Sequence, residues 1–193
     1  MGAVTAILLF LLGLMVIVMI VGVRIYKHLL EVKHDINRAW ADIDTLLEQR
    51  HDELRELVET CKLFMKSEQA TLEKVMEARS AVARARQTGD IGAVGKAETR
   101  LRTNLGNLFA VADGYPDLRT SEKFQHLQIR VSGLENTIAE QRASYNASVT
   151  INNKRIEQFP DLLLARLFKF TPQRLLEFSE EETRDVNMRE LYS

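Results

Sequence analysis

The sequence is poor in residues that mark turns, crosslinks or a surplus of one charge. It has only 3 Pro and 9 Gly among 193 residues, too few for an architecture of short strands and turns, so long helices are expected. A single Cys excludes an internal disulfide, and no CxxC pair supports a zinc ribbon or c-type haem attachment. Lys and Arg total 26 against 27 Asp and Glu. This balance argues against a nucleic-acid partner, which requires a basic excess.

A long apolar run opens the chain. Residues 3–23 contain no charged side chain, and Thr5 is the only clearly polar one. As a helix this run covers about 31 Å, which matches a hydrocarbon core of about 30 Å. A cleaved signal peptide would need a basic stretch before the run and a small-x-small site after it, whereas here Arg24 follows the run directly. We therefore predict a retained transmembrane anchor over residues 1–24.

The flanks of this anchor predict its orientation. Arg24, Lys27, Lys33 and Arg38 follow the run, and no Lys or Arg precedes it. Cations close to a span stay on the cytoplasmic side, so we expect the N-terminus outside and the rest of the chain in the cytoplasm. An unpaired Cys61 is compatible with that reducing compartment.

Two long and two short amphipathic stretches follow the anchor. Apolar residues at steps of three and four predict long helices that are buried along one side. The first stripe consists of Leu29, Val32, Ile36, Trp40, Ile43, Leu47, Leu54, Leu57, Cys61 and Phe64, and the second of Phe124, Leu127, Val131, Leu134, Ile138, Tyr145, Val149, Ile156 and Phe159. Between them, Leu72, Val75, Met76, Val82 and Ala83 predict one shorter helix, and Val94, Ala97, Leu101, Leu105, Leu108 and Val111 predict another.

The order long, short, short, long predicts the topology. With Gly89-Asp90 as a turn between the short helices and a loop at residues 114–118 before the last helix, the chain fits an up-down-up-down arrangement. The predicted fold is all-α: an N-terminal transmembrane helix followed by an elongated antiparallel helical bundle over residues 25–159. We expect the loop at residues 114–118 at the membrane-distal tip.

Residues 160–193 form a third region with a different character. Pro160 is expected to end the last long helix, and residues 162–170 are rich in Leu and Phe with two cations among them. These residues either enter the lipid headgroup layer or cap the open end of the bundle, and the pattern fits both readings. Thr171-Pro172 has the pattern of a helix start, as does the capping-box spacing of residues 179–182. The acidic tail, residues 177–190, is expected to be mobile or weakly docked.

Candidates for chemistry are few. Glu48 and His51 have the Glu-x-x-His spacing of di-iron bundles, but no second such pair exists, and Glu122 with His126 does not complete a cage. Phosphate-binding and nucleophile motifs are absent, and Cys61 falls on the apolar stripe, where a small buried hydrophobe is expected. We predict no catalytic, cofactor or metal site, and hence no enzyme. The Asn146-Ala147-Ser148 sequon lies in a predicted cytoplasmic helix and should stay unglycosylated.

The two long stripes also suggest a register. If Leu29 lies beside Ile156 in an antiparallel pair, Arg50, which interrupts the first stripe, faces Glu135. A partly buried ion pair there would fix register more than it stabilises, although Arg50 can instead extend its head group to water. The same register brings Trp40 and Tyr145 to one level, where core packing is expected.

Several segments resemble the LemA family of bacterial membrane-anchored proteins, in order along nearly the whole chain. They are residues 39–44 (AWADID), 50–52 (RHD), 57–60 (LVET), 77–80 (EARS), 108–112 (LFAVA) and 115–118 (YPDL), together with Arg142, Tyr145, Asn146 and Phe159-Pro160. The family often has Pro soon after its His-Asp pair, whereas residues 53–56 have none, which predicts a straight first helix.

The resemblance implies an anchored helical bundle in the bacterial inner membrane and brings no established enzymatic activity. Some members of the family are linked to magnetosome membranes, and others are encoded near a membrane zinc metalloprotease. We therefore expect a non-enzymatic membrane scaffold or adaptor that contacts the lipid bilayer and forms a homo-oligomer. The alternative is a membrane-coupled sensor or regulator of a partner such as a membrane protease.

Overall fold

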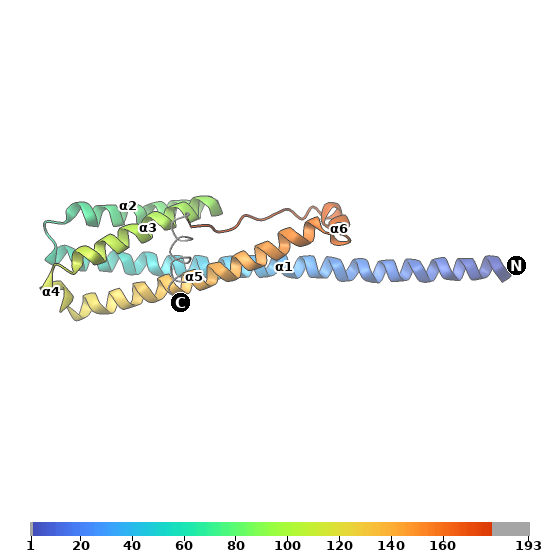
Figure 1. The fold of residues 1–193 in the computed structure, drawn as a ribbon, viewed down its shortest axis with the longest axis horizontal. Coiled ribbons are helices and arrows are strands. Elements are labelled where there is room, and N and C mark those ends of the chain that lie inside the picture. The colour runs from blue at the N-terminus through green and yellow to red at the C-terminus, as the bar shows by residue number, and fades with distance from the viewer. Residues whose placement is uncertain (1, 179–193) are drawn as a thin grey trace, which may run out of the picture. The chain divides into compact units, whose positions relative to one another are not determined.

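The computed structural model describes residues 2–178, and all regular elements in that range are helices (Figure 1). The elements are α1 (Gly2–Phe64), α2 (Gln69–Thr88), α3 (Ile91–Ala112), α4 (Pro116–Arg119), α5 (Glu122–Glu157) and α6 (Asp161–Leu167). This confirms the predicted all-α class. Contacts divide the described residues into a first unit, residues 2–38 and 147–173, and a second unit, residues 39–146 and 174–178.

Helix α1 carries both the apolar run and the first apolar stripe. It is one continuous α-helix from Gly2 to Phe64 (Figure 1), and it contains no Pro that would remove a backbone donor. The absence of Pro at residues 53–56 correctly predicted an unbroken helix there. The boundary that we place at residue 24 is therefore a change of side-chain character and not a break in the backbone.

The turn between α2 and α3 follows directly from its residues. Gly89 adopts a left-handed φ of 66°, which glycine reaches without steric cost, and its N–H donates to the Arg86 carbonyl. Asp90 then caps α3, because its carboxylate accepts from the N–H groups of Gly92 and Ala93 at 2.9 and 3.3 Å. The predicted turn at Gly89-Asp90 is confirmed, and α2 and α3 pack side by side as a hairpin (Figure 1).

The loop before α5 contains a short helix that the sequence analysis did not predict. Residues 116–119 form the single turn α4, because Pro116 occupies its first position, where a missing N–H costs nothing. Asp113, Gly114 and Tyr115 connect α3 to α4. The Tyr115 hydroxyl lies 2.8 Å from Ser67 Oγ and donates to Glu68 Oε1 at 3.3 Å, so the α1–α2 and α3–α4 connections meet at one end of the second unit.

The core of the second unit is built from the predicted stripes. Ten of its larger apolar side chains in α1, α2, α3 and α5 are almost inaccessible to solvent: Ile43, Leu47, Leu54, Leu57, Val75, Val94, Leu101, Leu108, Val131 and Ile138. Two predicted stripe positions are wrong, since Phe64 and Phe159 are exposed. Both lie where a long helix ends and the chain turns away, and Met65 takes the buried place beside Cys61 instead.

Polar contacts connect the helices of the second unit. Buried Arg79 on α2 donates through Nε to the His51 carbonyl on α1 at 2.7 Å, and Arg86 Nε donates to Asp44 Oδ1 at 2.6 Å. Arg130 on α5 pairs with Glu53 on α1. These contacts add directionality to packing that apolar surfaces alone leave free to slide.

The predicted helix start at Thr171-Pro172 is wrong. Residues 171–178, named here the C-terminal segment, have no helical structure. The reason is that α5 side chains bind the backbone of this segment, as described below, and replace the hydrogen bonds that a helix would make internally. The capping box at residues 179–182 and most of the acidic tail lie outside the described residues.

Candidate functional site

The apolar run is the feature of the first unit with the clearest physical meaning. Helix α1 is long and apolar enough to cross a membrane: its most apolar 18-residue stretch has a mean hydropathy of 3.2, and protein buries none of those residues. Large apolar side chains from Val4 to Val23 are therefore exposed. Such a surface requires a cover other than water, and one helix that satisfies its own backbone meets the requirement for spanning lipid.

Helix α6 packs against α1 just after this run. Leu29 of α1, Ile156 of α5 and Ala165 of α6 form a buried cluster, with Ile25, Leu164 and Phe170 partly buried against it. This confirms the predicted neighbourhood of Leu29 and Ile156. Leu164, Ala165 and Phe170 thus cover apolar surface of α1 and α5 within the first unit, which agrees with the capping interpretation for these three residues.

A closing motif turns the chain at the end of α6. The Phe170 N–H donates to the Ala165 carbonyl at 2.9 Å and the Lys169 N–H to the Arg166 carbonyl at 3.4 Å. This is the Schellman pattern, in which Gly usually takes the left-handed position. Here Lys169 takes it with φ 56°, so the motif presents a cation at a site where the backbone favours glycine.

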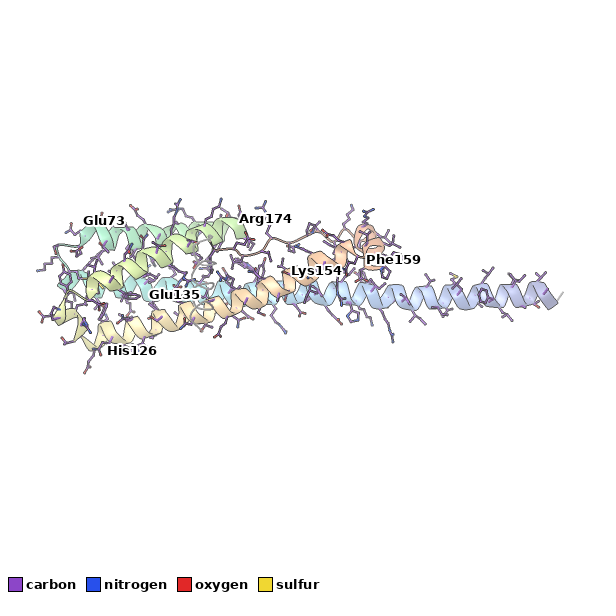
Figure 2. All side chains as sticks on the ribbon, in the orientation of Figure 1. Glu73, His126, Glu135, Lys154, Phe159 and Arg174 are labelled. Carbon is purple, nitrogen blue, oxygen red and sulfur yellow. The ribbon has the colours of Figure 1, made fainter. Side chains whose placement is uncertain are left out.

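The opposite side of α6 is open. Leu163 and Leu167, four residues apart and so on one helical face, are 61% and 70% exposed, and the flanking Phe168 is half exposed. Phe159, labelled beside α6 in Figure 2, is 79% exposed. These exposed side chains remain available for the alternative that the sequence left open, contact with lipid.

A buried cluster of three charges lies in the second unit. Arg50 of α1 donates from Nη2 to both carboxylate oxygens of Glu98 on α3, at 2.5 and 2.6 Å, and from Nη1 to Glu135 Oε1 on α5 at 2.6 Å. The Arg50 and Glu98 side chains are each 1% exposed. The predicted Arg50–Glu135 pair is confirmed, and the extension of Arg50 to water is wrong.

Glu98 was not predicted, although the sequence carries a signal for it. It lies four residues after Val94 and three before Leu101, hence on the apolar stripe of α3. A charged residue on such a stripe next to a buried Arg indicates a partner. A charged residue thus interrupts each of these two apolar stripes: a basic one, Arg50, in α1 and an acidic one, Glu98, in α3.

The electrostatics of the cluster favour a permanently charged Arg50. Burial lowers the pKa of its guanidinium, but Glu98 and Glu135 outweigh burial and raise the pKa above its ordinary value. Burial raises the pKa of Glu98, and Arg50 opposes that shift. A buried ion set of this kind positions helices precisely enough to fix register, and its desolvation cost leaves little net stabilisation.

The cluster continues toward the C-terminal segment. Arg102 Nε lies 3.5 Å from Glu135 Oε2, and the Arg102 guanidinium also lies 5.9 Å from the ring centroid of Phe178. Arg142 is closer to this ring, at 4.1 Å, a distance typical of a cation–π contact. A series of contacts thus runs from Glu98 through Arg50, Glu135 and Arg102 to the buried ring of Phe178.

Side-chain amides of α5 bind the backbone of the C-terminal segment. In the second unit, Asn146 Nδ2 donates to the Leu176 carbonyl at 3.1 Å and Asn146 Oδ1 accepts from the Leu176 N–H at 2.8 Å. The Tyr145 hydroxyl donates to the Arg174 carbonyl at 3.0 Å. The predicted contact of Tyr145 with Trp40 is confirmed, with ring centroids 5.9 Å apart.

In the first unit another Asn side chain binds the backbone of the C-terminal segment in the same way. Asn153 Nδ2 donates to the Gln173 carbonyl and Asn153 Oδ1 accepts from the Gln173 N–H, both at 2.9 Å. Asn152, which is buried, donates to the Thr171 carbonyl at 3.3 Å. Asn side chains act here as the neighbouring strand of a β-ladder would, which is why the segment needs no internal hydrogen bonds.

Gly95 of α3 permits the close approach of the C-terminal segment. A Cβ at this position would lie 2.2 Å from the Glu177 carbonyl oxygen, a distance that two such atoms never adopt. The requirement concerns close packing and not backbone conformation, since Gly95 is helical. Leu176 and Phe178, on either side of Glu177, are both buried.

The residues with metal-site spacing are engaged elsewhere. Glu48 Oε2 accepts from Arg86 at 3.3 Å, and burial together with the positive charge of Arg79 lowers the pKa of His51. Glu122 and His126 are exposed on α5. Within residues 2–178, no group of three or more His, Cys, Asp or Glu side chains is placed to hold a metal ion. Cys61 is fully buried, as predicted, and burial raises the pKa of its thiol to about 12.

Comparison with known proteins places these features in a family. The family model described as LemA family matches residues 39–189. The chain is 29% identical over 82 residues to "Magnetosome protein MamQ" of Magnetospirillum gryphiswaldense, covering 42% of this chain and 29% of that protein. "Magnetosome protein MamQ 1" and "Magnetosome protein MamQ 2" of Paramagnetospirillum magneticum are each 32% identical over 85 residues, covering 42% of this chain and 31% of each relative. The chain thus matches less than a third of the length of these relatives.

Proposed function

Because the chain belongs to the LemA family, we propose that it works as a non-enzymatic membrane scaffold or adaptor of the bacterial inner membrane. The first part of α1 serves as the single transmembrane anchor, with its N-terminus outside. The helical bundle of the second unit is presented in the cytoplasm as a docking body for other proteins.

One observation carries this proposal: a single helix, α1, contains both the exposed apolar run and the stripe around which the bundle is built. Helical residues, and not an irregular linker, therefore join the apolar run to the stripe. Arg24, Lys27, Lys33 and Arg38 are all exposed after the run, which supports the cytoplasmic side for the bundle.

The interior of the second unit supports a structural role over a catalytic one. Among its buried charges, Arg50 and Glu98 belong to the Arg50 cluster, where opposite charges bind each other, and Arg79 donates to the His51 carbonyl. Polar side chains also hold the C-terminal segment in place. Self-association through polar helix faces or through residues 162–170 would multiply the docking surface.

Retention and topology are tested together in cells. A mass spectrum of the intact membrane-extracted protein should include residues 1–24, and a C-terminal reporter that is active only outside the cytoplasm should remain silent. Loss of the first residues would overturn the anchor, and an active reporter would reverse the orientation. Light scattering in nanodiscs tests self-association separately, and monomer mass over the accessible concentration range would contradict it.

The C-terminal segment supports a second candidate, a membrane-coupled regulator of a partner such as a membrane protease. The segment is held by side-chain hydrogen bonds from α5, by the buried side chains of Leu176 and Phe178, and by the approach of Glu177 to Gly95 of α3, and release of these contacts would leave the hydrogen bonds within the helices intact. Proximity labelling from the bundle would favour this candidate if it recovers one stoichiometric partner in the wild type and loses it in a variant that cannot dock the segment.

A further inference from the structure

The position of α6 along α1 is fixed by contacts within the first unit. Ile25 and Leu29, which pack against α6, come two and six residues after Val23. At about 1.5 Å per residue they lie about 3–9 Å beyond the apolar run. The headgroup layer on each side of a bilayer is roughly 5–8 Å thick. If α1 spans the membrane, α6 therefore lies at the level of the lipid headgroups.

Aromatic packing at this level has the composition of a membrane interface. The Tyr26 ring lies 4.7 Å from Phe168 and 6.3 Å from Phe170, measured between centroids. Lys33 Nζ lies 6.0 Å from the Phe170 centroid. Tyr and Lys with apolar stems and polar ends are favoured where hydrocarbon meets headgroups.

The outer face of this packing has no cover among the described residues. Phe159, Leu163 and Leu167 follow one another at intervals of four, and all three are well exposed. Single exposed apolar residues are ordinary, but several within ten residues beside a membrane span indicate an interaction surface. We name this set, with Phe168, the α6 apolar face.

Cations surround the α6 apolar face. Arg166 and Lys169 are exposed on the same segment, and Arg24 and Lys27 are exposed on α1. Two acids of the first unit have a basic neighbour: Asp161 lies 4.0 Å from Arg155, and Glu31 lies 3.2 Å from His28. Asp35 on α1 and Glu157 at the end of α5 are exposed acids as well.

From these observations we propose that the α6 apolar face inserts into the headgroup layer of the leaflet from which α1 emerges, and that Arg166 and Lys169 bind anionic phospholipid headgroups there. This inference rests on the proposed anchor. It adds a second, one-leaflet contact that makes the protein respond to the charge of that leaflet and to the space between its headgroups.

The experiment uses the full-length protein in vesicles with one environment-sensitive fluorophore attached to an introduced thiol. The native Cys61 is buried, so the labels at Leu163→Cys and Ile129→Cys report their own sites. Ile129 is 71% exposed on α5 in the second unit and is the matched control for an exposed apolar side chain. Vesicles contain a spin-labelled lipid that quenches at the headgroup level.

The proposal expects blue-shifted emission and quenching at Leu163, and neither at Ile129. Equal, water-like emission at both sites would overturn it. A blue shift at Leu163 without quenching by the spin-labelled lipid would also overturn it, since it would indicate a second protein copy as the cover. A fluorophore at Ile17→Cys tests the anchor itself, in vesicles whose lipid carries the quenching spin label at the bilayer centre. If Ile17 is quenched and Leu163 is not, the inference fails while the anchor stands.

The lipid charge is tested by comparing zwitterionic vesicles with vesicles that contain phosphatidylglycerol. Each cation near an anionic surface changes the equilibrium by about fivefold, so insertion at Leu163 should be stronger with phosphatidylglycerol. The double variant Arg166→Gln/Lys169→Gln should weaken that preference, because only Arg24 and Lys27 remain near the face. Equal quenching of the wild type in both vesicles would overturn the assignment of an anionic ligand.

Discussion

Arg50 Nη1 on α1 donates to Glu135 Oε1 on α5 across 2.6 Å, although 85 residues separate the two in the chain. The same guanidinium binds Glu98 on α3. Three helices of the second unit are therefore tied at one level by a single side chain. Because apolar contacts alone leave helices free to slide, we expect the cluster to fix the register of these three helices more than it stabilises them.

Replacing Arg50 with Leu should destabilise the protein by about 3–5 kcal/mol, because Glu98 would remain buried without its counter-charge. Chemical denaturation of the detergent-solubilised protein measures this loss. Burial raises the pKa of Glu98 already, and removal of Arg50 raises it further. The penalty of the variant should therefore shrink as the pH falls and Glu98 takes up a proton.

A triple variant separates charge burial from specificity. Arg50→Leu/Glu98→Leu/Glu135→Leu removes all three charges. Its free energy of unfolding should equal that of the wild type or exceed it by up to about 4 kcal/mol. If register depends on the cluster, crosslinks between Trp40→Cys and Tyr145→Cys should become less selective in this background. A triple variant that is as unstable as Arg50→Leu would contradict the account.

Regular patterns made much of this fold readable from the sequence. Steps of three and four predicted the two long helices, and the interruption of a stripe by Arg50 predicted its pairing with Glu135. The resemblance to the LemA family is borne out by the family match over residues 39–189. Local chemistry also predicted the turn at Gly89, where a left-handed residue is required.

Contacts that leave no repeating pattern in the sequence could not be predicted. Residues 171–178 carry helix-start residues, but their conformation is decided by Asn146 and Asn153, which lie far away in sequence. The role of Gly95 depends on the approach of Glu177, which no local pattern encodes. Helix α6 showed both an apolar and a basic character in sequence, and only packing divides its residues into a buried and an exposed face.

Cys61 should report the opening of the bundle. Its thiol has a pKa of about 12 against an ordinary value of 9.0, so about 1000-fold less thiolate is present at pH 8 and alkylation under native conditions should be very slow. Alkylation should become fast and stoichiometric in denaturant. Rapid alkylation of the folded protein would show that Cys61 is not buried in solution.

The same pKa shift predicts a pH dependence of stability. Because the folded state holds the proton of Cys61 more tightly than the unfolded state, this group leaves stability unchanged below about pH 9. Between about pH 9 and 12 the free energy of unfolding should fall by at most about 1.4 kcal/mol per pH unit. A Cys61→Ala variant lacks this contribution, and identical pH slopes in the two proteins would contradict the prediction.

Asn146→Ala should free the Leu176 backbone. Both the N–H and the carbonyl of Leu176 lose their partner, and a buried unsatisfied polar group costs about 1–3 kcal/mol. Hydrogen exchange at the Leu176 amide should accelerate at least about fivefold. Asn153→Ala is the reciprocal control, since it should accelerate exchange at Gln173. Similar acceleration at both amides in both variants would indicate general unfolding of the C-terminal segment.

Gly95→Ala should expel the C-terminal segment from α3 while leaving α3 itself helical. The new methyl group would lie 2.2 Å from the Glu177 carbonyl oxygen, which belongs to backbone and cannot rotate away. The contacts of Leu176 and Phe178 would be lost with it, and trypsin should then cleave after Arg174, whose carbonyl is bound by Tyr145 in the wild type.

Gly106→Ala on the same helix is the matched control, because nothing lies within 4 Å of its added Cβ. That variant should gain about 0.5–1 kcal/mol from helix propensity and keep the wild-type cleavage rate. Cleavage that is equally slow in both variants would mean that the segment does not rest on Gly95.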